Sequence, residues 1–227
     1  MAESPVQGQG QTDPPWVADG VRAALAELRF FAQTLLAYVK SPRRFGAEWG
    51  AGTLRALNPA AFALNAVSFN GVWHILVVKA MSVELKAEPP LWAQALKATL
   101  PFVFGALFSI LGHAAVRLAG SRRPYRNSLA LSLFTSGPML LFGAPLVPIL
   151  AQTYRDPKTL ASGLMVAAAA PAMMGLYIGF TASAMSGLHG VKKRWPATGY
   201  FLGFAFNAVV FSFLQRWNPE AMRWFSI

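Results

Sequence analysis

Few side chains in this 227-residue sequence have the chemistry of a catalytic site. There is no cysteine, which excludes thiolate nucleophiles, disulfides and zinc–thiolate sites. Of the three histidines, His74 and His113 lie in apolar stretches, and His189 ends another such stretch, three residues after Ser186. A serine beside a histidine is a requirement for one kind of nucleophilic catalysis, but no GxSxG elbow accompanies this pair. We therefore predict no enzymatic activity and no catalytic residue.

The polar residues inside the apolar stretches admit two interpretations. Two imidazoles on separate helices could share a metal ion, but no third His, Cys, Asp or Glu stands at the same depth to complete a site. The alternative is hydrogen bonding between helices, or a polar groove for a lipid headgroup or small solute. No HExxH motif and no phosphate-binding glycine loop is present. We predict no metal and no cofactor for this intramembrane polar set: Asn65, Asn70, His74, His113 and Asn207.

Long apolar stretches must position these residues, and residues 159–187 form the main one. They contain no charged side chain over 29 positions, whereas about 20 apolar residues suffice to cross a hydrocarbon core of about 30 Å. Small residues recur at every fourth position, which places them on one helix face that a neighbouring helix can approach. Gly199 and Gly203 form a GxxxG pair nearer the C-terminus. The predicted helix-packing residues are Gly163, Ala167, Gly175, Gly179, Ser183, Gly187, Gly199 and Gly203.

The composition favours a membrane protein. The chain is 55% hydrophobic and only 13% charged, against about 25% charged residues in ordinary globular domains. We predict an all-α fold: a polytopic integral membrane protein with five transmembrane helices and an N-terminal amphipathic interfacial helix. Proline is tolerated in a span only where neighbours satisfy the freed carbonyls, so the third span should be broken by Pro138, Pro145 and Pro148, with its second half kinked or partly unwound. The spans are about 59–81, 91–118, 127–152, 159–187 and 195–214.

The segments outside the spans complete the predicted organisation. The apolar side of the helix over 17–40 includes Val21 and Leu25, and this helix could lie in the membrane interface or pack on the cytoplasmic face of the protein itself. Ser41-Pro42 ends it, and Phe45 is expected to insert at headgroup level. The segments are a disordered tail over 1–16, the amphipathic helix and basic lead-in over 17–56, the membrane domain over 57–216 and a short extracytoplasmic tail over 217–227.

The charge of the chain is strongly positive, at +11 from 20 Lys and Arg against 9 Asp and Glu. The basic residues flank apolar runs, so topology and anionic lipid explain them better than nucleic acid, which we do not predict as a partner. Thirteen Lys and Arg alternate onto one side of the spans and six onto the other, which places the N-terminus in the cytoplasm and the C-terminus outside a bacterial inner membrane. These clusters set topology or form a surface for anionic lipid or an acidic partner: Arg43, Arg44, Arg122, Arg123, Arg126, Lys192, Lys193 and Arg194.

The order of these parts resembles the Yip family of Rab-interacting multispan membrane proteins, including its prokaryotic relatives. The matching pieces are SPRRF at 41–45, GSRRPYRNSL at 120–129, TSGPML at 135–140 and SGLHGVKKRWPA at 186–197. The resemblance covers roughly residues 36–215 and implies a non-enzymatic five-helix membrane domain, which in eukaryotes is associated with small GTPases and vesicle traffic. No long acidic or proline-rich cytoplasmic domain precedes the bundle here, so a trafficking role is not expected.

Two functions follow as hypotheses. The first is a membrane scaffold or partner- and lipid-binding bundle, whose partners are the bilayer, anionic lipids at the cytoplasmic face, and a membrane protein or a second copy of the chain. The alternative is a small-solute or lipid transporter or channel that uses the polar face of the first span and the proline-broken third span. Transporters often show internal repeats, and we find no convincing repeat between the halves of the chain.

Overall fold

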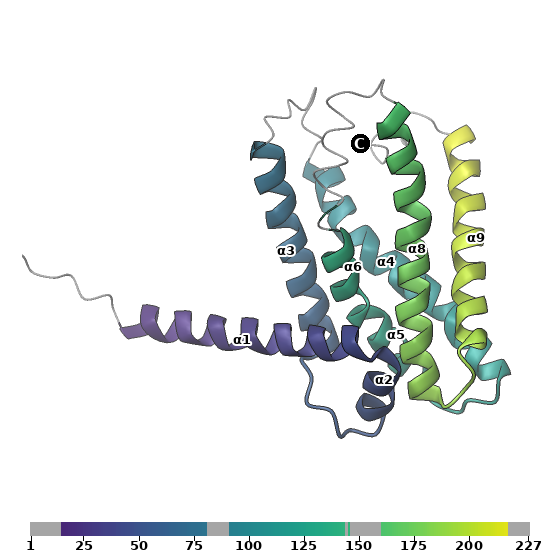
Figure 1. Ribbon diagram of the computed structural model, residues 1–227, viewed down its shortest axis with the longest axis horizontal. Helices are drawn as coiled ribbons and strands as arrows, with labels where there is room; N and C mark the ends of the chain where they lie inside the picture. The colour runs from purple at the N-terminus through teal and green to yellow at the C-terminus, as the bar shows by residue number, and fades with distance from the viewer. Residues whose placement is uncertain (1–14, 81–90, 144, 146–159, 218–227) are drawn as a thin grey trace, which may run out of the picture.

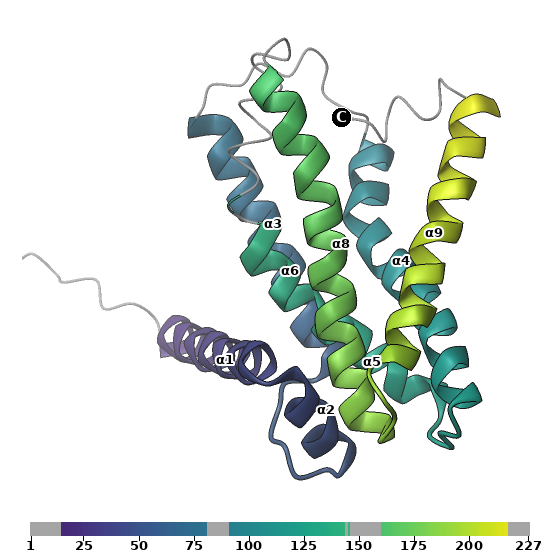
Figure 2. The ribbon, with the colours of Figure 1, turned by 45° about the vertical axis from the view of Figure 1, so that its right-hand side comes forward.

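The computed structural model describes residues 15–80, 91–143, 145 and 160–217, and within these ranges the chain is all α-helical, as predicted. Helices α3, α4, α8 and α9 run side by side as a bundle, and α1 lies crosswise at one end of it (Figures 1 and 2). The helices are α1 (Pro15–Lys40), α2 (Pro42–Gly50), α3 (Pro59–Ala80), α4 (Leu91–Leu118), α5 (Tyr125–Phe134), α6 (Ser136–Gly143), α8 (Leu160–His189) and α9 (Arg194–Trp217).

The long helices coincide with the apolar stretches of the sequence. Helices α3, α4, α8 and α9 match the stretches 59–81, 91–118, 159–187 and 195–214 to within three residues at either end. Counting only the residues that the structure describes, no helix is both long enough and apolar enough to cross a membrane.

The third predicted stretch is divided into α5 and α6, and the break falls at Thr135. Proline has no backbone N–H, so Pro138 cannot donate to the Phe134 carbonyl four residues earlier, and the regular ladder is interrupted there. Helical bonding resumes from Met139 N to the Thr135 carbonyl at 3.2 Å, and Ser136 Oγ donates to the Leu133 carbonyl at 2.6 Å. The proline effect was therefore predicted correctly at this position, whereas residues 146–152 lie outside the described ranges.

Helix α2 is an element that the sequence pattern did not predict. Helix α1 ends at Lys40, just before the expected Ser41-Pro42 stop, and Pro42 then starts a new helix, since proline is well accommodated in the first helical turn. The prediction that Phe45 inserts at headgroup level was wrong. Its side chain is only 2% exposed and lies against the rings of Tyr38 and Phe134, with ring centroids 5.0 and 4.9 Å away.

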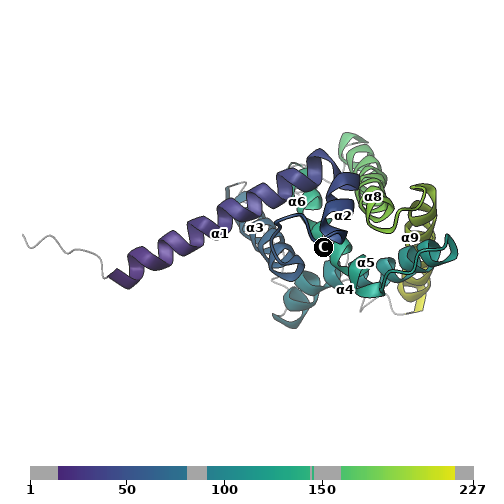
Figure 3. The same ribbon diagram turned by 90° about the horizontal axis from the view of Figure 1, so that it is seen from below.

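The two halves of α1 have different surroundings. In the C-terminal half, Phe31, Leu35 and Tyr38 recur at helical spacing and are buried against the bundle. In the N-terminal half, Val21 and Leu25 are more than half exposed, and this half extends away from the bundle (Figures 1 and 3). The C-terminal half thus packs on the protein itself, and the apolar side of the N-terminal half is left uncovered. Residues 1–14 of the predicted tail lie outside the described ranges.

Buried hydroxyl groups link the helices inside the bundle. Tyr38 Oη and Thr135 Oγ1 are 2.8 Å apart, and Thr135 Oγ1 and Thr181 Oγ1 are 3.0 Å apart, so one hydrogen-bonded chain joins α1, the α5–α6 break and α8. Burial raises the pKa of Tyr38, which therefore stays a neutral phenol. Tyr200 of α9 is also fully buried, with its hydroxyl 2.7 Å from Ser132 Oγ.

The outward faces of the bundle carry many large, exposed apolar side chains. On α9 the inward face consists of Gly199, Tyr200 and Gly203, which are buried, while Phe206 and Val209 on the outward face are each 67% exposed. The interior of the bundle also contains large apolar side chains, so the unusual feature is the amount of large apolar surface that remains exposed on the outward faces. Further exposed side chains of this kind are Leu64, Val72, Leu76, Leu107, Ile110, Phe201 and Phe213.

Candidate functional site

The predicted basic clusters gather at the end of the bundle that carries α2. Helix α2, the α4–α5 link over 119–124 and the α8–α9 link over 190–193 all lie there, and we call this region the α2 end (Figures 1 and 2). Arg43, Arg44, Arg122, Arg126, Lys192, Lys193 and Arg194 are exposed, and Arg123 is half-buried. Three segments far apart in the sequence thus contribute positive charge to one face of the molecule.

Close backbone contact between α2 and α8 brings the first and the third of these segments together. A Cβ at Gly46 would overlap the carbonyl of Ala184, and a Cβ at Gly187 would overlap the carbonyl of Arg43. Arg123 from the α4–α5 link completes the junction, since its guanidinium donates to the Gly50 carbonyl at 2.8 Å. The small residues are required here because any side chain would push the two backbones apart.

A cluster of imidazole and hydroxyl groups lies behind this junction. His189 at the end of α8 has its Nδ1 2.6 Å from Ser121 Oγ and its Nε2 2.9 Å from Ser128 Oγ. Ser128 Oγ is also 2.8 Å from His113 Nδ1, and Arg123 N donates to Ser121 Oγ at 3.4 Å. These five residues connect α4, the α4–α5 link, α5 and α8.

The contacts are consistent with a single direction of donation. If the Arg123 amide donates to Ser121, that hydroxyl donates to His189 Nδ1, His189 Nε2–H donates to Ser128, and Ser128 donates to His113. Every member then has a partner, and His189 is neutral. Burial, with His113 and Arg123 nearby, lowers the pKa of His189 to about 4, which agrees with a neutral ring at pH 7.

The hydrogen bonds of this cluster hold α4, the α4–α5 link, α5 and α8 together. Both nitrogens of His189 are engaged, so the ring offers neither a free base nor a free metal ligand. Ser186 is the serine that lies near His189 in the sequence. Its hydroxyl donates instead to the Val191 carbonyl at 2.6 Å. Within the described ranges no group of three or more His, Cys, Asp or Glu side chains could hold a metal ion.

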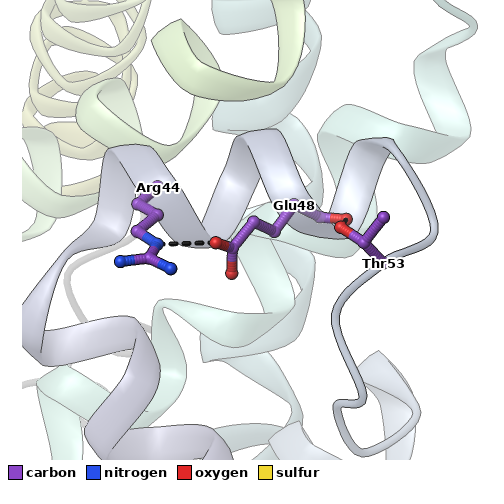
Figure 4. Close-up of polar contacts among 3 residues, drawn as sticks. All are labelled: Arg44, Glu48 and Thr53. Carbon is purple, nitrogen blue, oxygen red and sulfur yellow. Dashed lines mark hydrogen bonds and ion pairs between the residues drawn. The ribbon is translucent and has the colours of Figure 1, made fainter.

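Helix α2 also carries one ion pair, between Arg44 and Glu48 (Figure 4). Arg44 Nε donates to Glu48 Oε1 at 2.6 Å, and the hydrogen bond to the carboxylate raises the pKa of the exposed guanidinium. The backbone carbonyl of Glu48 accepts from Thr53 Oγ1 at 3.1 Å, which fixes the start of the α2–α3 link. Arg44 is thus partly neutralised by its own helix.

A hollow of about 360 Å³ lies beside the α8–α9 link. It is lined by Ala119, Gly190, Val191, Lys192, Arg194 and Trp195. The Arg194 guanidinium carbon lies 6.0 Å from the centroid of a Trp195 ring, close enough for a cation–π contact. Two cations beside an aromatic surface are a suitable arrangement for an anionic headgroup.

The predicted packing residues divide into two groups. A Cβ at Gly187 would overlap α2, as described above, and one at Gly199 or Gly203 would crowd α4, next to Leu111 and Phe108 respectively. At Gly175 and Gly179 a Cβ would have no other atom within 4 Å among the described residues, so no close neighbour is seen there. Ser183 bonds to the Gly179 carbonyl of its own helix at 2.7 Å. The side-chain surroundings of Gly163 and Ala167 are not among those described.

The predicted polar residues do not form one site among the described side chains. Asn65 Nδ2 donates to Glu27 Oε1 of α1 at 3.1 Å, His113 belongs to the His189 cluster, and Asn207 is half-buried on α9. The side chains of Asn70 and His74 lie outside the described set. Sequence reasoning missed Ser121 and Ser128, although both lie in the GSRRPYRNSL segment that was singled out for its charges.

Comparison with protein-family models, with curated proteins and with solved structures gives no match for this chain.

Proposed function

We propose that the chain is a non-enzymatic integral membrane protein of the Yip type, whose bundle binds anionic lipid or a partner protein at its α2 end. The observation that carries this proposal is the exposed apolar face of α9, which includes Phe201, Phe206 and Val209. Large exposed apolar patches are uncommon on monomeric soluble proteins and mark contact with membrane or protein. Hydrocarbon is a solvent that suits Phe206 and Val209 outside and Gly199 and Gly203 inside.

Two features of the sequence support the same proposal. Residues 159–187, almost all of which lie in α8, carry no charge, and the basic residues of the α2 end fit a cytoplasmic headgroup layer. The crosswise position of α1 agrees with a helix that lies along a membrane surface (Figure 1). The proposal rests on these distributions of apolar and basic side chains and not on a helix that meets the requirement for a span.

Extraction and labelling test the membrane location and the orientation together. Full-length protein should stay with the membrane fraction after washing with alkaline carbonate. Because the native chain has no cysteine, single cysteines can be introduced at exposed positions on opposite ends, Lys193→Cys and Trp217→Cys. An impermeant thiol reagent added to intact cells should label the second and spare the first. Release by carbonate, or labelling of the first in intact cells, contradicts the proposal.

A triple substitution tests lipid or partner binding at the α2 end. Lys192→Gln, Lys193→Gln and Arg194→Gln remove three exposed charges, and each basic residue near an anionic surface contributes about 1 kcal/mol. We expect unchanged topology, because ten basic residues remain on that side, and reduced co-purification of anionic lipid or partner. A variant that keeps both its topology and its bound lipids and partners would show that these charges act only during insertion.

Measuring solute and lipid flux in liposomes distinguishes the transporter hypothesis from this proposal. Purified protein in liposomes should not accelerate the movement of small solutes or of labelled lipid between leaflets. Protein-dependent flux would favour the transporter, and the proline-interrupted α5–α6 segment would then be the first place to substitute.

A further inference from the structure

A second hollow at the α2 end lies between α1 and the α2–α3 link. Its volume is about 670 Å³, within the range of about 300–1,000 Å³ that is usual for ligand sites. It is lined by Leu25, Ala26, Arg29, Phe30, Gln33 and Arg55, and we call it the Arg29–Arg55 hollow. Neither arginine belongs to the basic clusters that the sequence singled out.

Hydrogen bonds hold the two walls of this hollow in place. Thr34 of α1 is 2% exposed, its hydroxyl donates to the Phe30 carbonyl at 2.9 Å, and it accepts from the Leu57 amide at 3.1 Å. The other end of the link is fixed where Thr53 bonds to the Glu48 carbonyl. Arg55 therefore sits on a short link that is anchored on both sides, and its position beside α1 is set by the fold.

The arginines are available for an anion. The Arg55 guanidinium carbon lies 5.8 Å from the Phe30 ring centroid, which orients the group while leaving its edge N–H groups free to donate. Arg29 makes no ion pair within the described ranges. The nearest acid in the sequence, Glu27, is about 160° away around the helix and is engaged by Asn65, and Asp19 pairs with Arg22.

An apolar surface adjoins these charges. Leu25 lines the hollow, is 59% exposed, and shares one side of α1 with Val21 and Leu28, which are also exposed. Two guanidinium groups match the oxygens of a phosphate, and an adjoining apolar stripe matches an acyl chain. Inorganic phosphate would use only the first of these features.

We propose that the Arg29–Arg55 hollow binds the phosphate headgroup of an anionic phospholipid, with its acyl chains along the exposed stripe of α1. This inference rests on the proposed membrane location. It adds a specific lipid site, built by α1 and the α2–α3 link, to the general basic surface of the α2 end.

Lipid binding to the full chain in detergent tests the proposal. The probe is phosphatidylglycerol, titrated into delipidated protein and followed as bound lipid by native mass spectrometry. Arg29→Gln with Arg55→Gln should weaken binding by about fivefold for each arginine. The matched control is Arg22→Gln with Arg216→Gln, which removes the same charge from exposed positions outside the hollow and should change affinity less than twofold.

Two outcomes would overturn the site. Equal phosphatidylglycerol affinity of the Arg29/Arg55 variant and the wild type would show that the hollow is not used. Displacement of the lipid by millimolar inorganic phosphate would assign the hollow to free phosphate. Failure of the membrane proposal looks different, because the wild-type chain would then leave the membrane fraction on carbonate washing.

Discussion

Two parts of α8 carry the same spacing of small residues and have opposite surroundings. From Thr181 to His189 the helix is buried, touches the α2 backbone through Gly187 and ends in the His189 cluster. From Pro171 to Gly179 it is at least partly exposed, and Gly175 and Gly179 have no close neighbour. The difference lies in the partner, since Gly46 on α2 is as small as the residues that it meets. Small residues on one helix permit close packing, but a neighbouring helix must be present to make the contact.

The largest expected effect is at the α2–α8 contact. Gly187→Leu places a side chain against the Arg43 carbonyl, an obstacle made of backbone that cannot rotate away. Overpacking typically costs about 1–3 kcal/mol and here should reach or exceed the upper value, which lowers the Tm by about 6–12 °C. Thermal unfolding of the purified protein in detergent measures this shift. A Tm within 2 °C of wild type would show that α2 is not held against α8.

The next effect concerns the hydroxyl groups at the same end of α8. Ser128→Ala removes a partner from His189 Nε2 and from His113 Nδ1, and leaving buried polar groups unsatisfied costs about 1–3 kcal/mol. Ser212→Ala, on the exposed side of α9, is the control, because its hydroxyl bonds only to the Ala208 carbonyl of its own helix. In the same unfolding assay Ser128→Ala should have a lower Tm than Ser212→Ala. Equal Tm values would contradict the idea that the cluster stabilises the packing of these helices.

The third expected effect is a loss of thermal stability as the pH falls. The pKa of His189 is about 4 in the folded protein and 6.5 when unperturbed. Between these values the unfolded chain binds more protons, so the stabilising contribution is present above pH 6.5 and is lost as the pH falls toward 4. The Tm of wild type should fall over this window by more than that of His189→Gln. Parallel curves for the two proteins would show that His189 is not held neutral.

The smallest effect is expected on the other part of α8. A Cβ at Gly179 meets no atom within 4 Å among the described residues, and leucine favours helix, so for Gly179→Leu the Tm in detergent should change little or rise slightly. The original small-residue pattern predicted the opposite. A loss comparable to that of Gly187→Leu would mean that a second molecule covers this face, and cross-linking of the purified protein would then identify a dimer.

Much of the fold was predictable because apolar length and proline are strong local signals. The bounds of α4 match the predicted stretch to the residue, and the Lys40–Pro42 junction ends α1 as expected. Helix α2 was missed because its nine residues include two glycines, which have low helix propensity, and only tertiary contact with α8 explains them. The His189 cluster was missed for a related reason. Ser121 and His189 are 68 positions apart, and no periodic pattern in the sequence links them.

The long-range contact between α2 and α8 determines when the protein can finish folding. Gly46 meets Ala184 and Gly187 meets Arg43, although about 140 residues separate the two helices in the chain. At a synthesis rate of about 5–20 residues per second, α2 waits roughly 7–30 s before its partner on α8 exists. Throughout that interval Gly46 lacks the α8 backbone that it meets in the finished fold, and for roughly the first two-thirds of it Phe45 also lacks the α5 ring of Phe134. Helix α2 is therefore synthesised early but reaches its final packing late. A ribosome stalled before residue 160 would carry α2 without its partner helix α8.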